Sequence, residues 1–361
     1  MFDLVVIGGN LAGTTAAITA VSKCSNVALI EKNKEPFNPA HCGELIPSYT
    51  ADILNLDKMD CFKNEIKNMK IKVPPKEYNL KLKNKMIIFD RNCVENKLLN
   101  EAEKKGVTVM LGTKMKDFRP PYEIYLNNNK SIKGKVIIDA SGITCQVGKR
   151  IGINTKLKPM DVGVCIQSRV QSNYCEGTME LHFHKPYAPF GYAWLFPLNN
   201  TFANIGIIVP GGQKLDISKL LSCYIKDSSR EKLTIINTFR AYEPIALPLN
   251  ELYKNNVMIV GDAARLVYPE SGGGIDSALV SGRLAGITAA RYINGEINSL
   301  KPYQQALRVR ILRVKNGYNR KIRASKSDKK YIKTYQRIFL FLSIANRIFP
   351  SLLNSPWTGK Y

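Results

Sequence analysis

A glycine-rich turn near the start of the chain has the residue types that a pyrophosphate needs. In the segment GGNLAG at 8–13, Gly8 permits a tight turn and Gly13 lets a helix approach the preceding strand closely. The free N–H groups at the start of that helix would face a pyrophosphate. Glu31, followed by Lys32, can accept hydrogen bonds from ribose hydroxyls. The pattern predicts a dinucleotide site, and the alternative is an ordinary turn between a strand and a helix.

Asn10 occupies the position of the middle glycine in the pattern G-x-G-x-x-G. Asparagine tolerates a left-handed backbone, so we expect the turn to survive, with the Asn10 side chain turned away from the phosphates or bound to them. Around it, residues 2–7 predict a buried strand, 14–21 a helix of small residues and 26–30 a second strand. Strand, turn, helix, strand and acid together predict a Rossmann βαβ unit.

Two further predicted strands deliver polar groups at their ends. Residues 135–138 lead into Asp139, and residues 256–260 lead into Gly261 and Asp262, ahead of a predicted helix over 275–290. A carboxylate beside a helix start can bind sugar-like hydroxyls while the helix N-terminus faces a phosphate or a ring carbonyl. The residues expected to hold a polar cofactor here are Asp262, Gly272, Gly273, Gly274 and Ile275.

Between these cofactor segments the chain alternates in hydrophobicity, which predicts an antiparallel sheet. Tyr192, Trp194 and Phe196 alternate with smaller residues and therefore point to one face of a strand. This aromatic row is either the wall of an apolar cavity or a packing stripe against a neighbouring helix. The predicted strands cover 161–170, 178–184, 192–197 and 202–209.

The three cofactor segments, in this order, resemble the flavoprotein group that includes aromatic hydroxylases and geranylgeranyl reductases. The pattern G-D-A-A-x-x-x-x-P-x-x-G-G-G-I runs from 261 to 275, and the resemblance implies FAD as the cofactor, with Asp262 on its ribityl chain. Arg91 matches the group's Arg ahead of a helix that touches the cofactor, although Val94-Glu95 replaces the usual Phe-Asp.

Two motifs narrow the resemblance to the geranylgeranyl reductase branch, over roughly residues 1 to 310. PAHCGE at 39–44 resembles the branch's P-x-x-C-G-E near the flavin ring, which implies that Cys42 and Gly43 lie at the cofactor. PFGYAWLFP at 189–197 matches P-x-x-Y-x-W-x-F-P. The archaeal digeranylgeranylglycerophospholipid reductases are similar in kind. The resemblance therefore implies an FAD-dependent enzyme that saturates C=C bonds of prenyl chains on lipids, with Tyr192, Trp194 and Phe196 binding the chain.

The chemistry of that reaction assigns Cys42 a tentative role. An isolated alkene needs a hydride on one carbon and a proton on the other, so Cys42 beside the flavin either shapes the site or relays a proton, and the alternative is a small packing residue. No second Rossmann motif appears, so a stable NADPH site is not indicated, and the expected electron donor is either NADPH or a ferredoxin-like protein. The rival function is an FAD-dependent monooxygenase or dehydrogenase of a small aromatic or quinone-like substrate.

Positive charge is concentrated at the C-terminus. The formal net charge is +24, and residues 301–361 carry fifteen Lys or Arg against the single acid Asp328, which gives +14 there. Such a tail predicts an anionic partner, and its apolar run from 338 to 353 favours phospholipid over nucleic acid. A helix in the membrane interface and a helix packed on the protein remain the two alternatives.

The remaining residue types predict an intracellular setting without a metal. The eight cysteines form no C-x-x-C pair and have irregular spacings, so we expect reduced packing residues rather than a zinc site or disulfides. His182 and His184 lack a third ligand at a suitable spacing. Without a signal peptide or spanning segment, the chain is expected to be cytoplasmic and peripherally associated with the cytoplasmic face of the membrane.

The predicted fold class is α/β, with a Rossmann-like FAD-binding domain, an antiparallel-sheet substrate domain and a helical C-terminal tail. The FAD-binding domain is discontinuous and covers 1–60, 85–155 and 255–300. The substrate domain covers 61–84 and 156–254. The basic C-terminal segment covers 301–361.

Overall fold

The computed structural model describes the chain except for residues 24–25, 36–41, 120–121, 174–176, 228–232 and 349–361. The chain forms two compact units, each assembled from three segments. Unit 1 comprises residues 1–38, 95–158 and 243–318, and unit 2 comprises residues 39–94, 159–242 and 319–361. Residues 301–361 are thus shared between the units, while the domain limits from the sequence stay a prediction.

Unit 1 contains a mainly parallel sheet. Its strands are β1 (Phe2–Ile7), β2 (Val27–Ile30), β6 (Thr108–Met110), β7 (Met115–Arg119), β8 (Glu123–Leu126), β9 (Ser131–Asp139), β15 (Tyr253–Lys254) and β16 (Val257–Ile259). Their order is β15-β16-β9-β1-β2-β6, and off this path β8 pairs with β9 and β7 pairs with β8. β1 pairs in parallel with both β2 and β9. This arrangement confirms the predicted Rossmann-like sheet.

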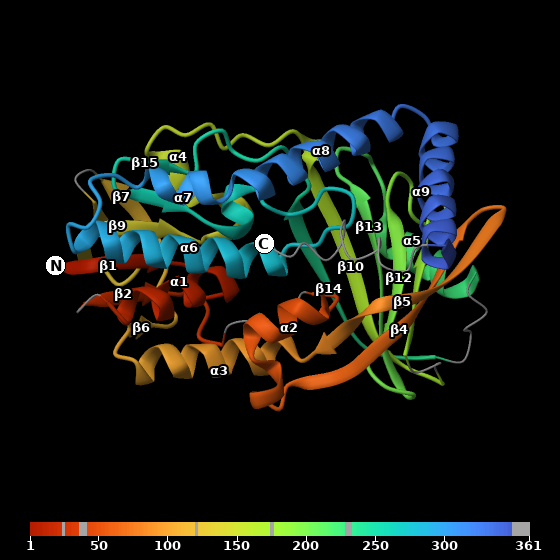
Figure 1. Cartoon of the computed structure of the whole chain (residues 1–361), viewed down its shortest axis with the longest axis horizontal. Coiled ribbons are helices and arrows are strands. Elements are labelled where there is room, and N and C mark those ends of the chain that lie inside the picture. Colours follow the sequence, from red (N-terminus) through yellow and green to blue (C-terminus); the bar gives the residue numbers. More distant parts are fainter. Residues whose placement is uncertain (24–25, 36–41, 120–121, 174–176, 228–232, 349–361) are drawn as a thin grey trace. The chain divides into compact units, whose positions relative to one another are not determined.

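The alternation of side chains along β1 explains its continuous apolar sequence. Leu4 and Val6 belong to one buried cluster, whereas Val5 and Ile7 belong to another. Successive residues of a strand point to opposite faces, so both faces of the sheet are covered. Ala16 is fully buried in α1, which packs against α6 (Figure 1). The helices of unit 1 are α1 (Leu11–Val21), η2 (Gly142–Thr144), α4 (Gln146–Arg150), η4 (Gly261–Ala264), α6 (Ile275–Ile293) and α7 (Lys301–Ala306).

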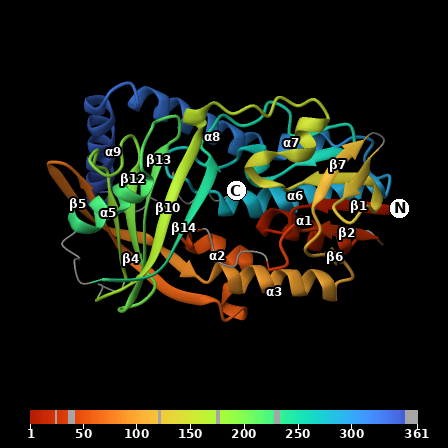
Figure 2. The same cartoon turned by 180° about the vertical axis from the view of Figure 1, so that it is seen from behind.

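Unit 2 contains an eight-stranded, mainly antiparallel sheet in the order β14-β10-β13-β12-β11-β4-β5-β3, and Figure 2 shows β14 and β10 side by side. The four predicted strands appear as β10 to β13, but the sequence missed the long hairpin of β4 and β5. β11 and β4 form a parallel pair. The strands are β3 (Leu45–Pro47), β4 (Phe62–Val73), β5 (Lys76–Phe89), β10 (Val162–Gln171), β11 (Thr178–His182), β12 (Tyr192–Pro197), β13 (Phe202–Pro210) and β14 (Thr234–Pro244).

Helices complete unit 2 and confirm the predicted helical C-terminus. α5 buries Ile217, Leu221 and Tyr224 against the sheet, and α9 packs on β4 and β5. Within the described residues, no helix is long and apolar enough to cross a bilayer. The elements are α2 (Ser48–Leu54), η1 (Leu56–Lys58), η3 (Pro159–Asp161), α5 (Ile217–Asp227) and α9 (Asp328–Ile348), while α3 (Arg91–Lys104) and α8 (Arg308–Ala324) run across the unit boundary.

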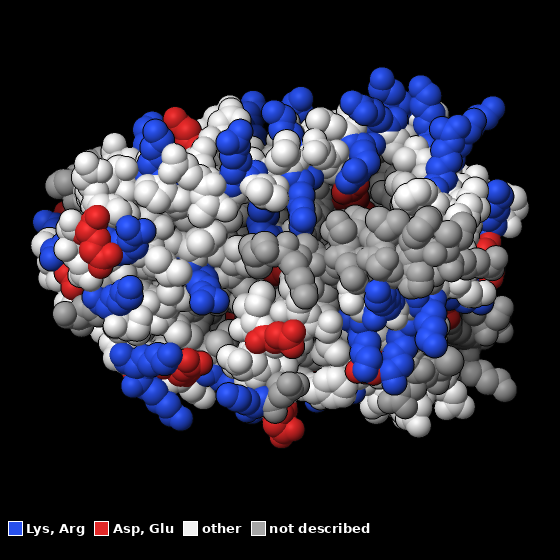
Figure 3. Space-filling view, in the orientation of Figure 1, with Lys and Arg blue, Asp and Glu red and all other residues white. Residues whose placement is uncertain are grey.

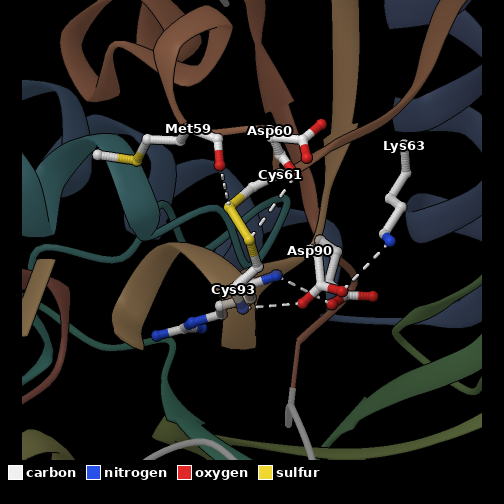
Figure 4. The surroundings of a disulfide bond; sticks show 8 residues. Met59, Asp60, Cys61, Lys63, Asp90 and Cys93 are labelled. Carbon is white, nitrogen blue, oxygen red and sulfur yellow. Dashed lines mark hydrogen bonds and ion pairs between the residues drawn. A yellow bond between two sulfur atoms is a disulfide. The ribbon is translucent and has the colours of Figure 1, made fainter. Parts of the chain in front are cut away.

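A disulfide in unit 2 corrects the expectation that the cysteines are reduced. Cys61, just before β4, is bonded to Cys93 in the first turn of α3, with their Cα atoms 5.7 Å apart (Figure 4). The Asp90 N–H donates to the Cys61 carbonyl at 2.7 Å, so the chain segments already meet there. Spacing along the sequence could not reveal this pair, because the fold brings the two segments together. Among the described cysteines, Cys42, Cys145 and Cys223 are free, while Cys24 and Cys175 lie outside the described residues.

Candidate active site

The turn between β1 and α1 has the close approach that the glycines predict. A Cβ at Gly13 would lie 1.9 Å from the Gly8 carbonyl oxygen, so only a glycine allows the helix to meet the strand end there. The left-handed position is Gly8, with φ of 109°, whereas Asn10 is extended with φ of −88° and ψ of −173°. The turn therefore survives, as expected, without a left-handed backbone at Asn10, because Gly8 already reverses the chain.

The carboxylate of Glu31 is held at the end of β2, and its side chain is buried. One oxygen accepts a hydrogen bond from the Gly9 N–H at 2.8 Å, and the other accepts from the Asn33 N–H at 2.8 Å. Each carboxylate oxygen can accept a second bond, so Glu31 keeps acceptor capacity for hydroxyl donors. Lys32 follows directly in the same unit.

Asp139, at the end of β9, has a structural role. Its carboxylate accepts hydrogen bonds from the N–H groups of Ser141, Val147 and Gly148 at 2.8–3.0 Å. These bonds hold the start of α4 and satisfy the negative charge. The neighbouring Ala140 carbonyl carbon and oxygen lie against Gly8, where a Cβ would come within 2.2 Å of that oxygen. The second predicted segment thus packs against the glycine turn at Gly8.

The third segment gathers a carboxylate and a helix start. Asp262 lies in η4 directly after β16, and Gly274 is the N-cap of α6. A Cβ at Gly274 would lie 3.4 Å from Asp262 Oδ1, so the carboxylate lies beside the helix N-terminus as the pattern predicts. Together with the backbone turn at Gly8–Gly13 and the Glu31 carboxylate, unit 1 offers a backbone cradle and two strand-end acids that fit FAD.

Glu243, at the end of β14, lies against the glycine-rich segment, and no sequence pattern marks it. A Cβ at Gly272, whose φ is 66°, would lie 2.3 Å from Glu243 Oε1. Burial and then the negative charge of Asp262 raise the pKa of the Glu243 carboxyl to about 8. A carboxyl group that keeps its proton at neutral pH therefore lies against the glycine-rich segment.

In unit 2, the turn at Cys42–Glu44 is fixed by buried polar contacts. Glu44 has a left-handed backbone with φ of 61°, and its N–H donates to Cys42 Sγ at 3.2 Å. The buried Glu44 carboxylate is ion-paired with Arg169 and accepts hydrogen bonds from the Asn204 amide at 3.0 Å and the Arg91 N–H at 3.2 Å. Desolvation raises the pKa of Glu44, and Arg169 lowers it in part.

The Cys42 thiol is neutral at physiological pH. Burial raises the pKa of this thiol, and the charge of Arg91 offsets part of the rise. A thiol in this state holds its proton and is a weak nucleophile. His41, its sequence neighbour, lies outside the described residues.

The aromatic row on β12 is joined to this turn. The Trp194 indole donates to Gln167 Oε1 at 3.0 Å, and the Gln167 amide donates to the Cys42 carbonyl at 2.9 Å. A Cβ at Gly43 would lie 3.0 Å from the Phe196 ring. No sequence pattern assigns a role to Gln167, since it looks like any inward residue of β10.

Rings of the row contact one another along β12. Tyr192 and Trp194 have centroids 5.9 Å apart, and Trp194 and Phe196 stack at 6.1 Å. Tyr192 also contacts Phe183 and packs on the cluster that contains Tyr335 of α9. One end of the row thus packs against a helix, which was one of the two alternatives, and the other end contacts the Cys42–Glu44 turn.

Comparison with known proteins assigns the family. Residues 3–158 match the model of FAD dependent oxidoreductases, and residues 161–242 match the model of the geranylgeranyl reductase catalytic domain. Digeranylgeranylglycerophospholipid reductase 1 of Methanococcoides burtonii is 30% identical over 311 residues, which cover 81% of this chain and 75% of that protein. The chain belongs to the geranylgeranyl reductase family of FAD-dependent oxidoreductases.

Other members and neighbours agree with this assignment. The digeranylgeranylglycerophospholipid reductase of Methanothrix thermoacetophila is 29% identical, over 80% of this chain and 77% of that protein. A geranylgeranyl bacteriochlorophyll reductase-like protein of Thermoplasma acidophilum has a TM-score of 0.86 at 22% identity, over 98% of both chains, and so shares the fold. This geranylgeranyl reductase-type enzyme is thus an FAD-dependent oxidoreductase, as predicted. The individual residues that bind the cofactor and the substrate, and those that act in catalysis, stay predictions.

Proposed function

We propose that this enzyme saturates C=C bonds in the geranylgeranyl chains of glycerophospholipids of the archaeal type. The relatives whose printed names include that substrate support the proposal. The observation that carries it is the bridge through Gln167, which joins Trp194 of the aromatic strand to the Cys42 carbonyl. Both motifs that distinguish this branch of flavoproteins are thereby parts of one hydrogen-bonded unit.

The cofactor would be held by the residues of unit 1 that form the backbone cradle. We assign the pyrophosphate to the turn at Gly8, Asn10 and Gly13, the ribose to Glu31 with Lys32, and the ribityl chain to Asp262. The N-terminus of α6, with Gly272, Gly273, Gly274 and Ile275, would stabilise negative charge on the ring. Arg91, Cys42 and Gly43 of unit 2 complete the proposed set. Reduced FAD supplies a hydride to one carbon of the double bond when it is bound.

The chain itself must supply the proton for the other carbon. Glu243 holds a proton up to about pH 8 beside Gly272, which is the protonation state that a general acid needs at neutral pH. The Cys42 thiol also keeps its proton, but its raised pKa makes it a poor donor without a partner. We therefore assign the donation of the proton to Glu243 and the shaping of the site to Cys42.

The aromatic row would bind the prenyl chain and exclude water. Trp194 and Phe196 expose less than a tenth of their surface, and their stacked rings offer an apolar wall. Apolar surroundings favour a polyprenyl chain by about 0.8 kcal/mol for each buried CH₂ group. Tyr192 would extend the same wall.

An anaerobic single-turnover experiment tests the proposal. The enzyme is reduced with dithionite, so that neither NADPH nor a ferredoxin-like donor is required, and is mixed with a digeranylgeranylglycerophospholipid. We expect oxidised-flavin absorbance to return without oxygen and the lipid mass to rise by one H₂ for each bond reduced. Oxygen-dependent hydroxylation of a small aromatic, with no reoxidation by the lipid, would identify the rival monooxygenase instead. Comparing Cys42→Ala with Cys223→Ala then tests the role of the thiol.

A further inference from the structure

A strongly cationic pocket lies between the end of α8 and the start of α9, within unit 2. Its volume is about 260 Å³, and its lining includes Arg320, Arg323, Lys330, Lys333, Arg337 and the hydroxyl-bearing Thr334. All five Lys and Arg residues are exposed. We call this the α8–α9 pocket.

The C-terminal segment that contains this pocket is rich in Lys and Arg, with fifteen of them in residues 301–361. Asp328, the acid of residues 301–361, is ion-paired with Lys185. Figure 3 shows Lys and Arg side chains gathered over the end of α8 and the start of α9. Guanidinium and ammonium groups that converge on one space bind phosphate oxygens by charge-assisted hydrogen bonds.

α9 has two distinct faces. One face is used inside the protein, where Tyr331, Tyr335 and Phe339 are buried against Tyr78 and Phe183 of the sheet. Of the two alternatives for the C-terminal segment, this packing agrees with a helix that lies on the protein.

The opposite face of α9 is exposed and changes character along its length. Lys330, Lys333 and Arg337 come first, and Leu340, Phe341 and Ile344 follow at spacings of three or four residues, which place all six on one side of the helix. The three apolar side chains are 44%, 69% and 47% exposed. Basic residues followed by apolar ones on a single exposed stripe are typical of helices that lie in a membrane interface.

We propose that this stripe and the α8–α9 pocket dock the enzyme on an anionic phospholipid bilayer. A headgroup phosphate would enter the pocket, and Leu340, Phe341 and Ile344 would enter the boundary between headgroups and acyl chains. The apolar half of the stripe selects a bilayer over a nucleic acid, because aliphatic side chains such as Leu340 and Ile344 gain little from a polyanion in water. The docking concerns where the enzyme works and does not depend on which double bonds it reduces.

Flotation of the FAD-bound enzyme with vesicles tests the docking. Vesicles of equal parts phosphatidylglycerol and phosphatidylcholine, with saturated chains, contain no bond to reduce, so binding is measured apart from the reductase activity. We expect wild type to bind these vesicles far more tightly than pure phosphatidylcholine, and less tightly as salt rises. Equal binding to both vesicles, or none to either, would overturn the proposal.

Charge reversal locates the contact. Each Lys or Arg near an anionic surface contributes about fivefold to binding, so Lys330→Glu/Lys333→Glu/Arg337→Glu should weaken it on the order of a hundredfold. The control reverses three exposed lysines elsewhere, Lys104, Lys130 and Lys226, and should retain most of the binding. Flavin absorbance and the melting temperature show whether each variant is folded. If the Glu variant does not fold, a variant with Gln at the same three sites replaces it in the binding test.

The apolar contact is tested separately. Leu340→Ser/Phe341→Ser/Ile344→Ser should lower binding at least tenfold while the salt dependence stays, whereas Leu111→Ser/Leu215→Ser, at exposed sites elsewhere, should not lower it. Unchanged binding in either stripe variant would refute the docking face. A wild-type enzyme that a short oligonucleotide or inorganic phosphate strips from the vesicles at micromolar levels would show a soluble-anion site instead.

Discussion

Gln167 donates a hydrogen bond of 2.9 Å from its side-chain amide to the main-chain carbonyl of Cys42. The same side chain accepts the Trp194 indole N–H at 3.0 Å. The indole can only donate and the carbonyl can only accept, so these two partners fix the orientation of the amide. One glutamine on β10 therefore determines how the Cys42 turn and the aromatic strand lie relative to each other.

Replacing Gln167 separates the two halves of this bridge. Gln167→Leu leaves the buried Trp194 N–H unpaired and should lower the free energy of unfolding by about 1–3 kcal/mol and reduce turnover. In Gln167→Glu the side chain can still accept a hydrogen bond from Trp194, but when ionised it cannot donate one to the Cys42 carbonyl. We therefore expect kcat to fall by a larger factor than the folding equilibrium constant. Gln171→Leu, at the exposed end of the same strand, is the control. Equal kcat for the Glu variant and wild type would refute a positioning role.

The Glu44–Arg169 pair predicts a second measurable loss. Glu44→Gln removes the charge from a buried carboxylate whose partner, the Arg169 side chain, is 31% exposed. We expect unfolding to become easier by roughly 2–3 kcal/mol, below the 3–5 kcal/mol for a fully buried pair because water still reaches Arg169. Glu101→Gln breaks the exposed pair with Lys105 and should cost under about 0.5 kcal/mol. Urea unfolding measures the free energy of unfolding of both variants. Similar losses in Glu44→Gln and Glu101→Gln would contradict the prediction.

Sequence patterns predicted the parts of this enzyme that are local along the chain. The turn at Gly8–Gly13, the strand at 192–197 and the acid at Asp262 each follow from neighbouring residues with a fixed periodicity. Gln167 and Glu243 could not be found in this way, because their roles depend on partners distant in the sequence. The Cys61–Cys93 bond was missed for the same reason. The β4–β5 hairpin was missed because its many lysines resemble a solvated loop.

Gly272 is predicted to tolerate alanine poorly, because its backbone is left-handed and the Glu243 carboxyl faces it. In Gly272→Ala the new methyl group would meet Glu243 Oε1 at 2.3 Å, on a backbone with φ of 66°. Gly295→Ala has a similar φ of 74° but meets no atom within 4 Å, so it measures backbone strain alone. We expect the first variant to lose about 1–3 kcal/mol more than the second, together with bound FAD. Flavin absorbance and thermal unfolding provide both readouts, and equal losses would show that strain alone matters.

Glu243 predicts a pH dependence of defined sign. Its carboxyl pKa is about 8 in the folded protein and near 4.3 in the unfolded chain, so the folded state holds an extra proton between these values. Stability should therefore fall with rising pH across that window, by up to about 1.4 kcal/mol per pH unit, and level off above pH 8. Glu243→Gln should remove this component.

The Glu243 carboxyl should also determine how turnover depends on pH. If Glu243 supplies the proton, turnover of wild type falls above about pH 8 and Glu243→Gln is slow at every pH. Glu251→Gln, an exposed site, controls for charge. Loss of the stability slope without any loss of turnover would leave Glu243 a structural role and refute the catalytic one.

The Cys61–Cys93 bond should contribute measurably to stability. The cysteines are separated by 32 positions, and closing a loop of this length in the unfolded chain is worth about 3–4 kcal/mol. Cys61→Ala/Cys93→Ala should be destabilised by roughly this amount, while Cys223→Ala, an exposed free cysteine, should behave as wild type. Dithiothreitol should lower the urea midpoint of wild type but not of the double variant.

The effect should also reach the proposed active site. Cys93 lies in the first turn of α3, and Arg91 at the start of that helix donates its N–H to Glu44. Reduction frees this end of the helix, so the double variant should exchange the Arg91 amide hydrogen faster and turn over more slowly. Hydrogen exchange measured by mass spectrometry tests this link directly. A wild-type enzyme in which reductant changes neither the unfolding midpoint nor the exchange of this segment would contradict a structural role for the bond.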